Sequence, residues 1–169
     1  EWLNIIVTAD TNIVNASIED KQISISSKAN AFGTDTIIIS ASDGFTTAND
    51  TSIIIVNSVN DKPVFVSAND TTLPENRPAG QLITNLLASN VEPDETLEYT
   101  MEGFASVFTI NSTSGKVTLA DSSFLNYENL SDTTITFIVT DNGTPALSDT
   151  MSFTLNISNI NERPYYLYY

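Results

Sequence analysis

The chain has 169 residues, 41% of them hydrophobic, and its 21 acidic against six basic side chains give a net charge of −15. Such a charge repels phosphate backbones and anionic lipid, which excludes nucleic acid and membrane surfaces as partners and makes a cation the natural small one. His and Cys are both absent, which removes the commonest general base and the softer ligands of zinc, copper and iron. We therefore expect a protein that is not an enzyme and whose chemistry rests on oxygen ligands.

Strand patterns dominate the chain. Apolar and polar residues alternate with period two at 22–26, and again at 135–140 and 153–157. Turn residues rich in Gly, Asn and Pro occupy 43–44, 76–80, 114–116 and 141–145. No segment has helical spacing, and no apolar run approaches the roughly 18 residues of a membrane-spanning helix. Many short strands between turns predict an all-β fold of antiparallel β-sandwich type.

The chain also repeats itself. A turn at Asp43 and another at Asp141 each precede a strand that ends in a similar linker, 59–63 (VNDKP) and 160–164 (INERP). The two linker prolines, at 63 and 164, are 101 residues apart (164 − 63), which is about the length of one sandwich domain. We expect residues 1–63 to hold only the later strands of one repeat, 64–164 a complete repeat, and 165–169 the first strand of a further one.

The short first repeat leaves two possibilities open. Its opening strands could precede residue 1 in a longer tandem array. Alternatively, the Tyr-rich segment 165–169 of another copy could complete its sheet, which would join copies head to tail into a filament.

The second repeat resembles the cadherin and cadherin-like repeat family. The resemblance rests on seven motifs in order: Leu73-Pro74-Glu75-Asn76, Leu97-Glu98-Tyr99, Phe108-Thr109-Ile110-Asn111, Ser114-Gly115-Lys116-Val117, Leu125-Asn126-Tyr127-Glu128, Val139-Thr140-Asp141-Asn142-Gly143 and Asn161-Glu162-Arg163-Pro164. The first repeat is similar to shorter, microbial cadherin-like modules through residues 32–34, 41–44 and 59–63. Its linker is one residue shorter than the animal pattern, which points to a microbial surface protein.

The resemblance implies calcium at domain junctions, where carboxylates from several segments supply the six to eight oxygen ligands that Ca²⁺ takes. Ligands implied after the second repeat are Glu75, Glu128, Asn161 and Glu162. Those implied between the repeats are Asn60, Asp61, Asp94 and Asp141, with Asn90 or Glu92 as weaker candidates. Because Asn126 replaces the family's usual Asp, and no Asp-x-Glu pair precedes Phe32, we expect the site between the repeats to be depleted.

Glycosylation is a further expectation. Seven Asn-x-Ser/Thr sequons occur, and those expected in turns are the accessible ones: Asn111, Asn129 and Asn142. Abundant Ser and Thr with scarce Lys are typical of exported β proteins. We expect an extracellular or cell-surface location.

Together these features predict an extracellular structural or adhesive segment of a surface fibre or adhesin, with junctions stiffened by calcium and with like repeats as partners. Two alternatives stay open: a polysaccharide-binding module, and a junction inside a large secreted enzyme.

Overall fold

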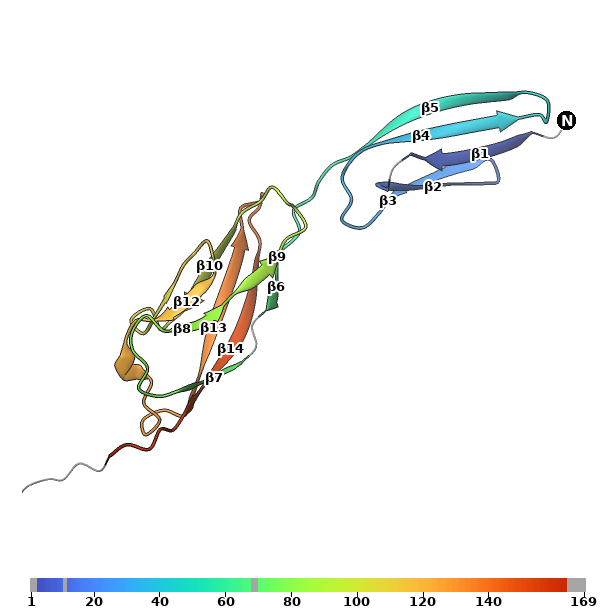
Figure 1. Ribbon diagram of the computed structural model, residues 1–169. Coiled ribbons are helices and arrows are strands. Elements are labelled where there is room, and N and C mark those ends of the chain that lie inside the picture. Colours follow the sequence, from blue (N-terminus) through green and yellow to red (C-terminus); the bar gives the residue numbers. More distant parts are fainter. Residues whose placement is uncertain (1–2, 11, 68–69, 164–169) are drawn as a thin grey trace, which may run out of the picture. The chain divides into compact units, whose positions relative to one another are not determined.

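The computed structural model describes residues 3–10, 12–67 and 70–163. The chain forms two compact units, Glu1–Val59 and Asn60–Tyr169. Nearly all regular structure in the described residues is β-strand, apart from a one-turn 3₁₀ helix at Ser122–Phe124 (Figure 1). The described part holds no helix that is long and apolar enough to cross a membrane. The all-β prediction is confirmed, whereas the strand expected at 165–169 and the sequon at Asn69 lie outside the described residues.

The first unit contains five described strands: β1 (Asn4–Ala9), β2 (Val14–Glu19), β3 (Gln22–Ser27), β4 (Gly33–Ser42) and β5 (Thr47–Val56). β1, β4 and β5 lie side by side in an antiparallel sheet, and β2 pairs with β3 (Figure 1). The β2–β3 turn has two residues, Asp20 and Lys21, both with positive φ (48° and 66°). This is the backbone of a tight turn whose twist matches its strands.

The core of the first unit is small. Val14 and Ile37 are its buried hydrophobic side chains among the described residues. Asp35 is 1% exposed beside them, and its carboxylate accepts hydrogen bonds from the backbone N–H of Val14 (3.2 Å) and of Thr36 (2.8 Å). These bonds satisfy the buried carboxylate and tie β4 to the start of β2.

The second unit contains nine described strands: β6 (Val64–Ser67), β7 (Thr71–Pro74), β8 (Leu82–Asn85), β9 (Leu87–Ser89), β10 (Leu97–Glu102), β11 (Phe108–Ile110), β12 (Lys116–Leu119), β13 (Asp132–Asp141) and β14 (Ser148–Ser158). The sheet orders are β10-β13-β14-β7, β11-β12-β8 and β6-β9. Alternation of buried and open positions along β13 and β14 turns Phe137 and Phe153 inward, with ring centroids 5.8 Å apart. Both rings are fully buried in a core shared by the sheets, as the predicted sandwich requires.

One strand pair differs from the predicted antiparallel arrangement. β7 pairs with β14 in parallel, from Thr71 opposite Leu155 to Pro74 opposite Ser158. The pair is possible because the chain between these strands is long, whereas a short hairpin such as the one between β13 and β14 can join only antiparallel strands. It carries the residue after Pro74 to the same end of the unit as the residues after Ser158.

Candidate metal centres

Glu75 follows β7 and is held from two sides. Its backbone N–H donates to the carbonyl oxygen of Ser158 at 3.0 Å, which continues the parallel pairing. Its carboxylate, 1% exposed, accepts from the backbone N–H of Ile160 (2.7 Å, Oε1) and of Tyr127 (2.9 Å, Oε2). The bonds from Ile160 and Tyr127 lower the pKa of Glu75 below its ordinary 4.5. The carboxylate is therefore ionised and fixed in position at neutral pH.

Two further carboxylates converge on Glu75. One oxygen each of Glu75, Glu128 and Glu162 lies within 4.8 Å of the others. Asn159 Nδ2 donates to Glu128 Oε1 at 3.1 Å, and Asn76 Nδ2 donates to Glu162 Oε1 at 2.8 Å. We call these three carboxylates the Glu75 cluster.

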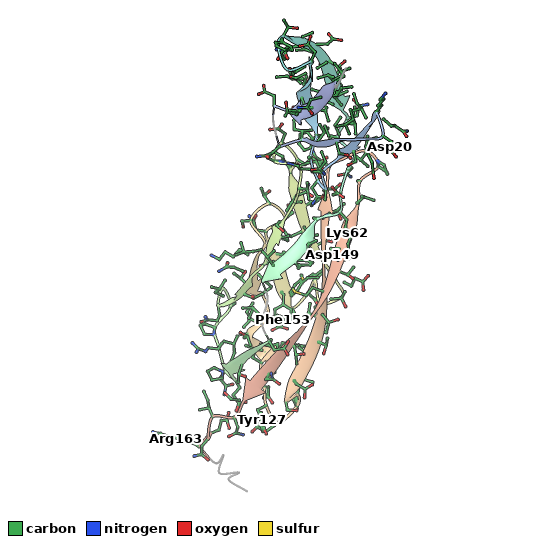
Figure 2. All side chains as sticks on the ribbon, turned by 90° about the vertical axis from the view of Figure 1, so that its right-hand side faces the viewer. Asp20, Lys62, Tyr127, Asp149, Phe153 and Arg163 are labelled. Carbon is green, nitrogen blue, oxygen red and sulfur yellow. The ribbon has the colours of Figure 1, made fainter. Side chains whose placement is uncertain are left out.

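No cationic side chain of the described residues neutralises the Glu75 cluster. The one ion pair in that part of the chain, Lys62 Nζ to Asp149 Oδ1 at 3.0 Å, lies elsewhere on the unit (Figure 2). Figure 2 also labels Tyr127, at the end where Arg163 leaves the unit. Three like charges at such separations repel one another unless a cation joins them. Carboxylate oxygens from three segments are the ligands that Ca²⁺ prefers.

Asp141 is the last residue of β13 and lies beside the start of β14, at the end of the unit opposite to Glu75. β14 spans 11 residues or roughly 35 Å. The side chain is 4% exposed, and Oδ1 accepts from Leu147 N (2.9 Å), Gly143 N (3.1 Å) and Asn60 Nδ2 (3.2 Å). Burial raises the pKa of Asp141, but the bonds from Leu147, Asn60 and Gly143 together outweigh it and hold the pKa below the usual 3.8. This carboxylate is also ionised at neutral pH.

Three buried oxygens at this end of the second unit accept no hydrogen bond within the described part of the chain. They are Asp141 Oδ2, Asn60 Oδ1 and Asn90 Oδ1. A buried acceptor without a partner costs free energy that a bound cation would recover. Glu92, two residues after Asn90, is 8% exposed, and its Oε2 accepts from the backbone N–H of Asp61 at 3.4 Å. We call Asn60, Asn90, Glu92 and Asp141 the Asp141 group; its oxygens suit a hard cation.

The structure brings together most of the residues implied by the resemblance. Glu75, Glu128 and Glu162 meet at one end, and Asn60 contacts Asp141 at the other. The backbone N–H of Asp61 donates to Glu92 Oε2, which holds Asp61 next to the Asp141 group. Asp94 and Asn161 are exposed, and neither side chain forms a hydrogen bond or ion pair within the described residues. Their role as ligands stays a prediction.

Two residues that the resemblance implied only as weaker ligands are less exposed in the structure than Asp94. Asn90 is half-buried and Glu92 is 8% exposed, whereas Asp94 is exposed. Asn76 and Asn159 were not foreseen, although Asn76 adjoins Glu75 and has a positive φ of 60°. Asn126, which stands where the family usually has Asp, accepts a hydrogen bond at Oδ1 from Asn129 N (3.1 Å).

The three expected glycosylation sites are exposed and lie outside strands: Asn111, Asn129 and Asn142. Asn111 Oδ1 accepts from Thr113 N (3.2 Å) and Ser114 N (2.8 Å), and Asn142 Oδ1 accepts from Thr96 N (2.8 Å). Their modification stays a prediction.

Comparison with known proteins agrees with the fold and the motifs. The family model for the cadherin domain matches residues 69–158, more than half of the chain. The chain belongs to the cadherin family. Cadherin domains are extracellular modules of the adhesion type, and they generally bind calcium. The microbial subtype stays a prediction.

Among curated proteins, human Protocadherin Fat 4 is 30% identical over 121 residues, which are 70% of this cadherin chain and 2% of the relative. Mouse Cadherin EGF LAG seven-pass G-type receptor 2 is 32% identical over 132 residues, 75% of this chain and 4% of the relative. The chain thus spans only a small share of these relatives. A solved structure of Protocadherin Gamma B2 extracellular cadherin domains 1-5 gives a TM-score of 0.65 at 20% identity, covering 94% of this chain and 34% of the other. At that identity the likeness shows the fold alone.

Proposed function

We propose that this chain is an extracellular adhesive or structural segment whose domain junctions are stiffened by calcium bound at the two ends of the second unit. The observation that carries the proposal is the Glu75 cluster: three carboxylate oxygens within 4.8 Å, with one carboxylate buried and ionised. The Asp141 group, which begins at the first residue of the second unit, supports a second site. Both sets come from several segments, so a cation that binds them restrains those segments together.

Calcium is expected to stabilise the second unit rather than to fold it. The unit already has a continuous core of fully buried side chains, including Phe108, Phe137 and Phe153. Extracellular calcium modules bind with a Kd on the order of 10⁻⁴–10⁻³ M. At about 10 mM calcium, such a Kd stabilises the folded state by about 1.4–2.7 kcal/mol for each ion.

Calorimetry of calcium binding, with urea unfolding in calcium and in chelator, tests the proposal. The variant Glu75→Gln keeps the size of the side chain but removes its charge, and it should weaken binding and reduce the gain in stability. Glu102→Gln is a matched control, because Glu102 is exposed on β10 opposite Thr136, in the middle of β13 and away from both candidate centres. Absence of binding heat in the wild type, or equal binding by wild type and Glu75→Gln, would show that the cluster is no calcium site.

The other partners remain part of the proposal. Like repeats of this or another copy are the natural macromolecular partners of an adhesive segment. The alternative of a polysaccharide-binding module stays open, and the hollow on the first unit is lined, among the described residues, by Leu3, Ile5, Ile18, Asp20 and Lys21.

A further inference from the structure

Asp149 takes a position in β14 where the strand otherwise carries apolar residues. The inward side chains of this strand from Met151 to Ile157 pack in or against the core. Asp149 continues their alternation toward the start of the strand, opposite the buried Val139 of β13. Its side chain is 20% exposed. A carboxylate that turns inward in this way is stable only with polar partners close by.

Both carboxylate oxygens of Asp149 bind the segment that opens the second unit, residues 60–65, which we call the opening segment. Lys62 Nζ donates to Oδ1 at 3.0 Å, and the backbone N–H of Phe65 donates to Oδ2 at 3.2 Å. Figure 2 labels Lys62 and Asp149 next to each other. The bonds from Lys62 and Phe65 lower the pKa of Asp149 below its ordinary 3.8, so the carboxylate is ionised at neutral pH. We call these two bonds the Asp149 clamp.

The opening segment also carries Asn60, a member of the Asp141 group. Asn60 is two residues before Lys62, and Pro63, which lies between the two partners of the clamp, is buried. Because the proline ring fixes φ and the clamp holds the chain on both sides of it, few conformations are left to this segment. Asn60 Oδ1, buried and without a hydrogen bond within the described residues, is thereby kept beside Asp141.

The clamp acts on the Asp141 group through the backbone. A cation that takes oxygens of both Asn60 and Asp141 binds less tightly when it must first order the opening segment, because affinity falls with the fraction of molecules already in the binding conformation. We propose that Asp149 is a positioning residue for the cation site at the Asp141 group: its clamp orders the opening segment before the cation binds. This inference rests on the proposed calcium function and adds a residue outside the candidate ligands.

NMR titration of the whole chain with calcium chloride tests the proposal, because backbone amides report on the two ends of the second unit separately. Two N–H groups donate to each buried carboxylate: those of Gly143 and Leu147 to Asp141, and those of Tyr127 and Ile160 to Glu75. We call the first pair the Asp141 reporters and the second pair the Glu75 reporters. Calcium at either end shifts the signals of its own pair, which gives a Kd for each end.

Asp149→Asn keeps the size of the side chain and removes its charge. The Kd from the Asp141 reporters should rise by about two- to fivefold, as for the loss of one partly exposed ion pair, while the Kd from the Glu75 reporters should stay unchanged. In chelator, the Phe65 amide should exchange faster with solvent than in the wild type.

Glu98→Gln is the matched control for charge. It removes the same charge from the same end of the unit, where Glu98 is exposed opposite Thr140 and has no hydrogen bond or ion pair within the part of the chain that the structure describes. It should raise the Kd from the Asp141 reporters less than Asp149→Asn does, and it should leave the exchange of the Phe65 amide unchanged.

Lys62→Met separates positioning from charge. Loss of a positive charge on its own favours binding of Ca²⁺, whereas loss of the clamp weakens it. The Asp141 reporters should therefore give a higher Kd in Lys62→Met than in the wild type. Asp149→Asn/Lys62→Met should bind no more weakly than the weaker single variant, because both substitutions break the same clamp. The Lys62 side chain is 59% exposed, so this variant should fold even where Asp149→Asn does not.

Different results would overturn different claims. A wild type whose reporters at both ends do not respond to calcium would contradict the proposed function, and the positioning role with it. A response of the Glu75 reporters alone would leave the proposed function standing and remove the positioning role. The positioning role would also be wrong if the Asp141 reporters gave the same Kd in Asp149→Asn as in the wild type, or a lower Kd in Lys62→Met. An unchanged exchange rate of the Phe65 amide in Asp149→Asn would contradict the clamp itself.

Discussion

Replacing Gly143 with Ala should disturb the Asp141 group through Asn60. A Cβ added at Gly143 would overlap the side-chain amide of Asn60. Gly143 is not among the residues with positive φ, so Ala can adopt its backbone conformation without strain. Asn60 must then leave its position, in which Nδ2 donates to Asp141 Oδ1 at 3.2 Å and to the carbonyl oxygen of Pro145 at 2.7 Å.

The expected cost follows from these two hydrogen bonds. A bond to a charged group contributes roughly 1.5–3 kcal/mol and a neutral one roughly 0.5–1.5 kcal/mol, which sum to about 2–4.5 kcal/mol. Asn60 is half-buried, so water replaces part of what is lost, and we expect Gly143→Ala to destabilise the second unit by about 1–3 kcal/mol. Calcium affinity at this end should fall as well, because an oxygen ligand has moved.

A double-mutant cycle with Asn60→Ala isolates the mechanism. Once the Asn60 amide is absent, Gly143→Ala meets no obstacle. It should then be neutral, or stabilising by about 0.4–1 kcal/mol through lower entropy of the unfolded chain. Urea unfolding, followed by near-ultraviolet circular dichroism, measures the four stabilities. If Gly143→Ala destabilises the Asn60→Ala background as much as the wild type, the clash with Asn60 is not the cause.

Three other predictions concern the second unit. Gly115→Ala should destabilise it by about 2–5 kcal/mol, because the residue has a φ of +68° and the new Cβ would lie 2.5 Å from the Leu86 carbonyl oxygen; an unchanged urea midpoint would contradict this. Glu75 and Asp141 have depressed pKa values when folded, so their stabilising effect is complete above the unfolded values of 4.5 and 3.8 and is lost as the pH falls through the lower folded values. Acid titration of the urea midpoint should therefore show a fall below about pH 4.5 that is smaller in Glu75→Gln, and equal falls would count against it. In a glycosylating host, peptide mass spectrometry should find glycans on exposed turn sequons and not on Asn156 inside β14, and the reverse pattern would refute the accessibility argument; the turn sites are Asn111, Asn129 and Asn142.

The sequence predicted strands well where one face is buried. Residues 135–140 and 153–157 alternate because their inward side chains, such as Phe137 and Phe153, enter the core. Burial on one face is a local property, and period two records it directly. The parallel pairing of β7 with β14 has no such local record, since it joins segments more than 80 residues apart, as with Thr71 and Leu155. For that reason an antiparallel sheet was expected throughout.

The candidate centres show the same limit. Glu75, Glu128 and Glu162 were implied by family motifs, but the β7–β14 pairing and the hydrogen bond from Tyr127 N to Glu75 bring their segments together, with one oxygen of each within 4.8 Å of the others. Asp94 and Glu92 are two residues apart in a segment without periodicity. The sequence there does not indicate which side chains point toward the core. In the structure Glu92 is buried and Asp94 is exposed.

Added salt tests whether carboxylates hold the proposed calcium ion. Calcium at the Glu75 cluster depends on attraction between an ion and partly solvated carboxylates, which added NaCl screens. Raising the NaCl concentration should therefore raise the Kd for calcium measured by calorimetry. A calcium Kd that does not change with salt would mean that these carboxylates are not the ligands.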